Sequence, residues 1–262
     1  MIKLPRTLHI EGSRTEKGEV DPNAVKFNTL KGEFLVVEEK VDGTGVSIFF
    51  DDDLSLKIWH RGSPATGKEF NRLYDWANTY HDQLFDLLDQ RFILFGEWMF
   101  LKHSIFYDNL PTYDGYAAYP YYFLESDMFD RRGHIWLATS ARQALLSNYS
   151  FIKSVPILKS FQPQTLSEVT SLIDKSAYQS NRWGDILTAK IALATHLDLD
   201  EEQVFKETDQ SSLMEGLYIK HENDRHVVGR YKYVRHEFVQ TIIKSGTHYK
   251  DRPMIANTYS VK

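Results

Sequence analysis

Short segments rich in β-branched and aromatic residues recur along most of this 262-residue chain, and turn-forming residues separate them. Segments of this kind predict β-strands, with turn signals at Asp51-Asp52-Asp53 and Arg132-Gly133. The predicted strands span residues 34–39, 46–50, 54–60, 91–100, 121–129 and 134–137. A succession of strands with short connections favours mainly antiparallel sheets.

Three stretches predict helices. Residues 67–88 carry apolar residues at helical spacing, a shorter helix begins at Ser140, and Thr165 with Glu168 forms a capping-box signature. From Thr165 to about Gln210 the pattern is helical and acidic. We therefore predict an α+β fold with largely antiparallel sheets in one domain, residues 1–262, with a helical insert at about 160–210.

The composition excludes several classes of protein. The chain has no cysteine, so disulfides, thiolate catalysis and cysteine-ligated zinc are excluded. The ten histidines show no HExxH or comparable metal-binding spacing. No apolar run approaches the roughly 20 residues of a membrane span, and the N-terminus lacks the apolar stretch of a signal peptide. We expect a cytoplasmic enzyme without membrane contact.

Charge is unevenly distributed behind a formal net charge of −5. Residues 220–262 hold nine Lys/Arg against four Asp/Glu, whereas residues 160–219 hold four against ten. We expect a phosphate-binding surface on the C-terminal strands, the alternative being a cationic face exposed to solvent. The acidic insert is a poor surface for a nucleic-acid backbone and suits a protein partner better.

A candidate nucleophile follows the apolar run at residues 34–37. Lys40-Val41-Asp42-Gly43 places a lysine at the end of a predicted strand, before an Asp-Gly turn. Lysine is a poor nucleophile at neutral pH, with a free pKa of about 10.4, so burial or nearby cations must favour the neutral amine. A simple turn between two strands is the alternative interpretation of Asp42-Gly43.

Four further segments follow in a fixed order, and two of them carry a glutamate inside an apolar strand. They are residues 95–100 (Phe-Gly-Glu-Trp-Met-Phe), 121–130, 214–220 (Met-Glu-Gly-Leu-Tyr-Ile-Lys) and 229–235 (Gly-Arg-Tyr-Lys-Tyr-Val-Arg). With Lys40, they resemble motifs I, III, IIIa, IV and V of the covalent nucleotidyltransferases, the polynucleotide ligases and mRNA capping enzymes. Residues 5–14 and 102–111 are similar to segments of ATP-dependent RNA ligases.

This resemblance implies a nucleotidyltransferase (adenylation) domain and an RNA ligase. Such an enzyme forms a lysyl-AMP intermediate, transfers AMP to a 5′-phosphate RNA end, and seals that end to a 3′-hydroxyl with release of AMP. ATP and Mg²⁺ (or Mn²⁺) are the implied cofactors, RNA repair is the implied process, and an RNA end-processing protein is an expected partner. Thirty residues follow Lys232, so we expect no OB-fold domain here.

The resemblance also implies roles for individual residues. Lys40 is the expected nucleophile, and Arg230 and Lys232 are expected to act on the phosphates as catalytic cations. Strand alternation puts these two cations on one face, where they could also lower the pKa of Lys40. Nucleotide contacts are expected from Glu39, Lys40, Arg61, Glu97, Phe123, Lys220, Arg230 and Lys232, and metal contacts from Asp42, Glu97 and Glu215.

Some positions leave alternatives open. Family members often have Phe directly before the acid at Asp127, where this chain has Ser126, so Phe123 is a candidate for stacking on adenine and equally a core residue. Lys220 is a nucleotide contact or a solvated strand-end lysine. A minimal DNA ligase has the same adenylation motifs, and a catalytically silent nucleotide- or RNA-binding module is a further alternative.

Overall fold

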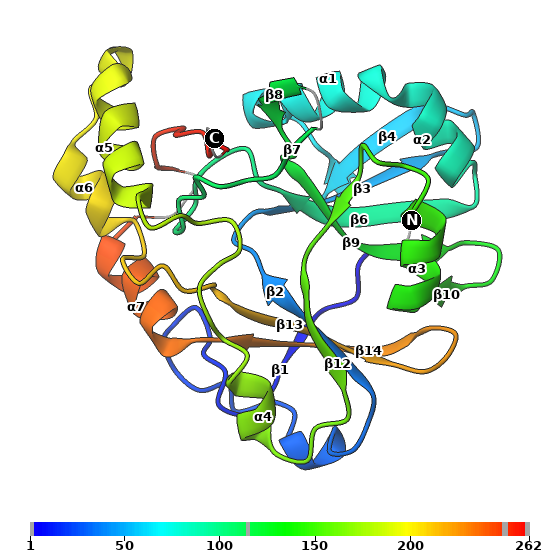
Figure 1. The fold of residues 1–262 in the computed structure, drawn as a ribbon. Coiled ribbons are helices and arrows are strands. Elements are labelled where there is room, and N and C mark those ends of the chain that lie inside the picture. The colour runs from blue at the N-terminus through cyan, green and yellow to red at the C-terminus, as the bar shows by residue number, and fades with distance from the viewer. Residues whose placement is uncertain (1–2, 114–115, 248–250, 260–262) are drawn as a thin grey trace.

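The computed structural model describes residues 3–113, 116–247 and 251–259. Within these residues two large sheets lie above and below one another in Figure 1. The lower sheet has five strands in the order β1 (Leu8–His9), β14 (Val227–Val234), β13 (Gly216–Glu222), β2 (Leu35–Lys40) and β12 (Ile157–Phe161). The upper sheet has seven strands. Its main path is β10 (Ile135–Trp136), β9 (Phe123–Asp130), β6 (Phe92–Trp98), β3 (Thr44–Phe50), β4 (Leu56–His60) and β5 (Ser63–Pro64), and β11 (Lys153–Ser154) pairs with β9.

Helices cover the outer faces of the sheets and fill the long connections. A separate ribbon pairs β7 (Thr112–Tyr113) with β8 (Tyr116–Pro120). The α-helices are α1 (Asn71–Thr79), α2 (His81–Leu88), α3 (Thr139–Leu146), α4 (Leu166–Thr170), α5 (Trp183–Leu193), α6 (Glu201–Lys206) and α7 (His236–Ser245). Short 3-10 helices span Phe27–Thr29, Lys68–Phe70 and Thr195–Leu197.

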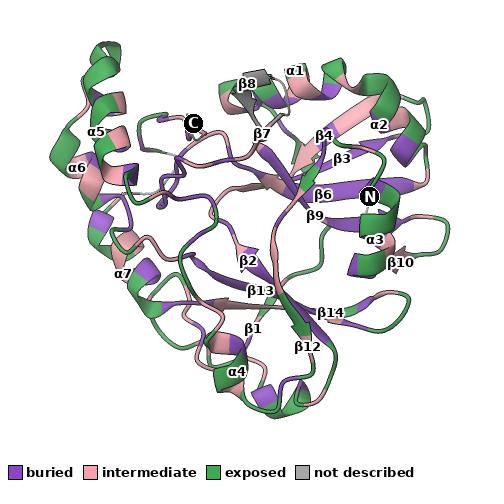
Figure 2. Cartoon of the chain, viewed as in Figure 1, coloured by how far each residue is buried: buried purple, intermediate pink, exposed green. Residues whose placement is uncertain are grey.

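The largest apolar core lies between the seven-stranded sheet and the pair α1 and α2. Alternation along β3 turns Ile48 and Phe50 toward these helices, where they meet Leu73 and Leu84. Figure 2 shows β6 and β9 largely buried, whereas α5 is mostly exposed. One face of the seven-stranded sheet therefore packs against α1 and α2, and its opposite face is directed toward the five-stranded sheet.

The predicted α+β fold with largely antiparallel sheets is confirmed, with parallel pairing of β1 to β14 and of β11 to β9. The helix predicted at residues 67–88 is interrupted at Tyr80, and the predicted cap at Thr165 is present, since its side chain accepts from the Glu168 amide. The short helices α4, α5 and α6 lie within the predicted helical region.

Between β14 and the last described residue there is helix α7 and irregular chain, so the described part contains no OB-fold. Among these residues no helix is long and apolar enough to cross a lipid bilayer.

Candidate active site

Lys40 is the last residue of β2, at the point where the chain leaves one sheet and enters the other. β2 pairs with β13 and β12, whereas β3 pairs with β4 and β6. Asp42-Gly43 therefore lies in a connection between two strands, as the alternative interpretation had it, but these strands belong to different sheets and do not form a hairpin. The crossing is tight, because a Cβ on Gly43 would lie 2.6 Å from Met99 Sδ and 3.2 Å from Glu97 Cβ. Glycine at this position lets the lysine segment lie directly against β6.

The Lys40 ammonium is held by carboxylates. Its Nζ lies 2.5 Å from Glu215 Oε1, and Glu97 and Asp42 add further negative charge nearby. Burial alone would lower the pKa of Lys40, but the ion pair with Glu215 outweighs it and the pKa is raised. The prediction that neighbouring cations would lower the pKa of Lys40 is wrong, because the carboxylates around it raise that pKa. Lys40 is therefore charged here and must lose a proton before it can act as a nucleophile.

Two buried or partly buried glutamates, Glu97 and Glu215, lie near Lys40, and their contact with a metal stays a prediction. Burial, reinforced by the charge of Glu215 and opposed by Lys40, raises the pKa of Glu97 to about 7. The Glu97 carboxylate makes no hydrogen bond with the described residues. Burial likewise raises the pKa of Glu215. Among the residues that the structure describes, no group of three or more His, Asp or Glu side chains is arranged to hold a metal ion.

Asp42 faces the loop that follows β6 and contains Ser104 and Ile105. Its Oδ2 accepts hydrogen bonds from the Ser104 amide at 2.6 Å and the Ile105 amide at 3.0 Å. Burial would raise the pKa of Asp42, but hydrogen bonding and charge from His103, the Ser104 amide and the charge of Lys40 lower it. Asp42 thus ties the Lys40 segment to the loop, and its contact with a metal stays a prediction.

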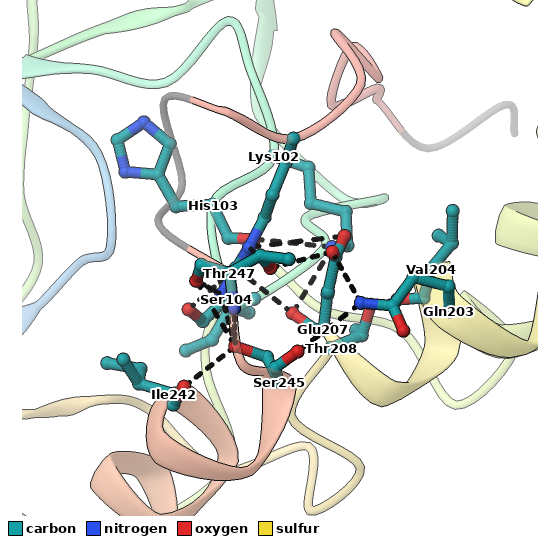
Figure 3. Close-up of polar contacts among 12 residues, drawn as sticks. Lys102, His103, Ser104, Gln203, Val204, Glu207, Thr208, Ile242, Ser245 and Thr247 are labelled. Atoms are coloured by element: carbon teal, nitrogen blue, oxygen red, sulfur yellow. Dashed lines mark hydrogen bonds and ion pairs between the residues drawn. The ribbon is translucent and has the colours of Figure 1, made fainter.

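Arg252, in the C-terminal segment, holds this loop in place by hydrogen bonds. Arg252 donates to the carbonyls of His103 at 3.0 Å and Glu207 at 3.3 Å, and also to Ser245 Oγ at 2.9 Å. Figure 3 shows Lys102, His103 and Ser104 beside Glu207, Ser245 and Thr247, which come from α7 and the chain around α6. The position of the loop, and through it that of Asp42, therefore depends on residues near the end of the chain.

A cavity of about 250 Å³ opens beside Lys40, between the two sheets. Its walls include Lys232, Tyr218 and His9 from the five-stranded sheet, and Glu97 and Ser126 from the seven-stranded sheet. A second cavity of about 340 Å³ shares Leu4, Glu97 and Ser126 with the first and contains Arg61. The linings of the two cavities contain the carboxylate Glu97 and the cations Lys40, Lys232 and Arg61.

Comparison with known proteins identifies the family to which this chain belongs. The model of the RNA ligase family matches residues 33–234, which is most of the chain. The chain belongs to the RNA ligase family. No curated protein matches this sequence. The RNA ligase fold is also seen in solved structures of Naegleria gruberi RNA ligase.

Two of these structures show how far the likeness extends. A variant with ATP and Mn has 16% identity and a TM-score of 0.53 over 83% of this chain and 54% of its own. A structure with pyrophosphate has 17% identity and a TM-score of 0.52 over 96% and 64%. This RNA ligase family member therefore shares their fold while spanning little more than half the length of these chains.

The two predicted catalytic cations of this RNA ligase family member, Arg230 and Lys232, have different surroundings. Lys232 lines the cavity, whereas Arg230 pairs with Asp127 at 2.8 Å and lies over the Trp136 ring. The two cations share a strand face but not a common target, because Asp127 of β9 holds Arg230. The direct contact of Arg230 with phosphate stays a prediction.

Lys220 and Phe123 are buried. The Lys220 ammonium pairs with Glu38 at 2.9 Å and donates to the Ser126 carbonyl, so the solvated interpretation is wrong. Phe123 lies in the core with its ring 5.4 Å from that of Trp76, which agrees with the core alternative.

The carboxylate of Glu39 faces away from Lys40. It accepts hydrogen bonds from Ser176 and Ala177, although the residue still contributes to the cavity wall. Arg61 is exposed in the turn after β4 and has a positive φ of 48°. Nucleotide contact by either residue stays a prediction.

Several cavity residues were not predicted, and two of them, Glu38 and Tyr218, carry polar groups beside Lys40 and Lys220 in the sequence. Glu38 is fully buried, and its Oε2 has no hydrogen-bond partner among the described residues. Tyr218 presents an aromatic ring, and its hydroxyl is fixed by Asp127 Oδ2 at 2.9 Å. Strand alternation is the signal that could have found them, because Glu38 lies two residues before Lys40 and Tyr218 two residues before Lys220.

Proposed function

We propose that this chain is an ATP-dependent RNA ligase that becomes covalently adenylated on Lys40. The Lys40 nitrogen attacks the α-phosphate of ATP, an N–P bond forms, and the P–O bond to pyrophosphate breaks. AMP then passes to a 5′-phosphate RNA end, and a 3′-hydroxyl displaces it to form the phosphodiester. The Naegleria ligase structures with ATP and Mn support this choice of nucleotide and metal.

The observation that carries the proposal is that Lys40, Lys232 and Glu97 line one cavity, while Glu215 holds the Lys40 ammonium. Glu215 touches the Lys40 ammonium and, with its raised pKa, is suited to accept the proton that Lys40 must lose. Lys232 faces the same cavity, and burial followed by the charge of Lys40 lowers its pKa. Such a site provides a nucleophile, a proton acceptor and a cation for the phosphate.

Magnesium fits the free carboxylate of Glu97 together with Glu215. When bound, it would neutralise triphosphate charge that the protein cations leave uncompensated. The other residues bind and orient the substrate. Asp42 fixes the segment that carries Lys40 through its two bonds to the loop amides.

The cavity also offers a place for the nucleobase. Tyr218 supplies an aromatic face, and nucleobases stack on such faces with a gain of roughly 1–3 kcal/mol. Glu38 Oε2 has no hydrogen-bond partner among the described residues, and as a carboxylate oxygen it suits the exocyclic amine of adenine as a donor. We propose that these two residues orient the base and that Ser126 leaves room for it on the opposite wall.

The decisive experiment is covalent labelling. Purified protein is incubated with Mg²⁺ and each α-labelled nucleoside triphosphate, denatured, and examined for label on the polypeptide. We expect label from ATP alone in the wild type and in Lys68→Ala, an exposed control, and none in Lys40→Ala. Label from GTP would indicate capping-type chemistry. Absence of label from a folded, AMP-free sample would refute the ligase proposal.

The polynucleotide substrate is tested by sealing. Nicked duplexes carry the 3′-hydroxyl on either RNA or DNA, with a 5′-phosphate across the nick. We propose that RNA strands are sealed, as a cytoplasmic repair reaction in which an end-processing protein supplies the two ends. Equal sealing of all-DNA nicks would instead favour the minimal DNA ligase.

A further inference from the structure

The first described residues of the chain line the catalytic cavity although they lie outside the family match. The match begins at residue 33, whereas Leu4, Arg6, Thr7 and His9 all contribute to the cavity that contains Lys40. This segment therefore adds a wall to the cavity from outside the matched range, although residues 5–14 resemble a segment of ATP-dependent RNA ligases. Its chemistry differs from the rest of the site, because it supplies an arginine and an imidazole.

Backbone pairing fixes the segment against the motif strand. β1 runs parallel to β14 with His9 opposite Lys232, and the Ile10 amide donates to the Lys232 carbonyl at 3.0 Å. Ile10 is buried, and Gly12 has the positive φ of 80° needed for the turn that follows. His9 and Lys232 thus lie side by side and line the same cavity.

The hydrogen bonds of Ser13 favour one position for the proton on His9. The buried Ser13 Oγ accepts from the Val234 amide at 2.9 Å and lies 2.6 Å from His9 Nδ1. The imidazole nitrogen is the only acceptor within the described chain for the hydroxyl proton, so Ser13 donates to Nδ1. The remaining proton of a neutral ring is then on Nε2, which leaves Nε2–H as a donor for a ligand.

The charges around His9 keep this ring neutral. Burial, then the cations Lys232, Lys40 and Arg6, outweigh Asp21 and lower the pKa of His9 to about 4. A neutral N–H group can donate to a phosphate oxygen across the whole physiological pH range. Arg6 adds a permanent positive charge in the same part of the cavity.

We propose that Arg6 and His9 form a phosphate-binding subsite for the triphosphate, with His9 acting as a neutral Nε2–H donor. This inference rests on the proposed function, since it names further contacts of the same nucleotide. The described N-terminal segment would then contribute to substrate binding as well as to packing. Lys232 would share the phosphate with His9 across the β1–β14 pair.

Binding measurements separate a phosphate contact from a structural role. In a Lys40→Ala background, which cannot react, calorimetry gives the Kd of ATP with Mg²⁺ and of adenosine. We expect Arg6→Ala and His9→Ala each to weaken ATP binding about tenfold and to leave adenosine binding unchanged. The control Arg14→Ala removes a cation from the same segment outside the cavity and should bind both as the parent does.

A spectroscopic readout tests the tautomer directly. Nitrogen-15 NMR of the imidazole at pH 7 should show His9 protonated on Nε2, with a shift of this resonance on addition of ATP. Unchanged ATP affinity in both variants, while the wild type labels Lys40, would overturn the inference and leave the proposed function intact. Equal losses for adenosine and ATP would also overturn it, by showing a structural role. Failure of the wild type to bind ATP would overturn both.

Discussion

Replacing Glu97 with glutamine should stabilise the protein at alkaline pH while it abolishes adenylation. The pKa of Glu97 is raised from its ordinary 4.5 to about 7, first by burial and then by Glu215. The folded protein therefore binds this proton more tightly than the unfolded chain. The associated stability is complete below about pH 4.5 and is lost as the pH rises through 7.

The magnitude follows from the two pKa values, which differ by an amount equivalent to about 3 kcal/mol. Because solvent reaches part of the Glu97 side chain, we expect Glu97→Gln to raise the free energy of unfolding at pH 8 by about 1–2 kcal/mol. At pH 4.5 the gain should be close to zero.

Urea unfolding at both pH values measures this difference, with exposed Glu19→Gln as the matched control. The same samples, incubated with α-labelled ATP, should show label in wild type and Glu19→Gln and none in Glu97→Gln. Wild-type labelling should fall about tenfold per pH unit below pH 7, because Glu97 must be ionised to hold a metal. A Glu97→Gln protein that is no more stable than wild type at pH 8, or equally stabilised at both pH values, would refute this reasoning.

Three further substitutions test other parts of the site. Gly43→Ala would place a Cβ 2.6 Å from Met99 Sδ, so we expect a loss of about 1–3 kcal/mol in urea unfolding and slower labelling; unchanged values would contradict the close approach. Tyr218→Val should raise the Kd of adenosine about tenfold, and addition of Ser126→Phe should restore part of it by supplying an aromatic face from the opposite wall; no effect of either change would exclude base stacking there. Arg252→Ala should slow adenylation more than it weakens ATP binding, because the loop that holds Asp42 loses its support; an equal effect on kcat and KM in a folded variant would argue against positioning.

The fold could be predicted because the long strands carry a clear pattern. β2, β3, β6 and β9 alternate or remain apolar over six to eight residues, and each was predicted to within three residues at either end. Two-residue strands such as β1 and β11 carry no such signal, since tertiary contacts alone define them. The interruption at Tyr80 was also invisible, because apolar spacing continues across it.

The structure brings three of the predicted motif residues close together, whereas the ion pair that Arg230 makes across the gap between the sheets was not predicted. The sequence pointed to Lys40, Glu97 and Glu215 as motif members, and the structure brings them together. Nothing in the order of residues indicates that Asp127 of β9 would bind Arg230 of β14. Strand alternation gives the face of a side chain but does not identify the neighbour across a gap between sheets.

The buried ionic network explains how two sheets can share one cavity. Arg142 bonds Glu38 of β2 at 2.9 Å and also Glu125 of β9, and Lys220 of β13 reaches both Glu38 and the carbonyl of Ser126. A hydrophobic contact of equal area would be no less stable, since buried ion pairs often contribute little net stability. A hydrophobic contact would, however, let one sheet shift relative to the other, whereas the directional hydrogen bonds of Arg142 and Lys220 favour one position of β2 relative to β9. The cavity walls lie on these two strands and their neighbours, so a fixed placement keeps Lys40 and Tyr218 at a constant distance from Glu97 and Ser126. We infer that the network is retained for geometry rather than for stability.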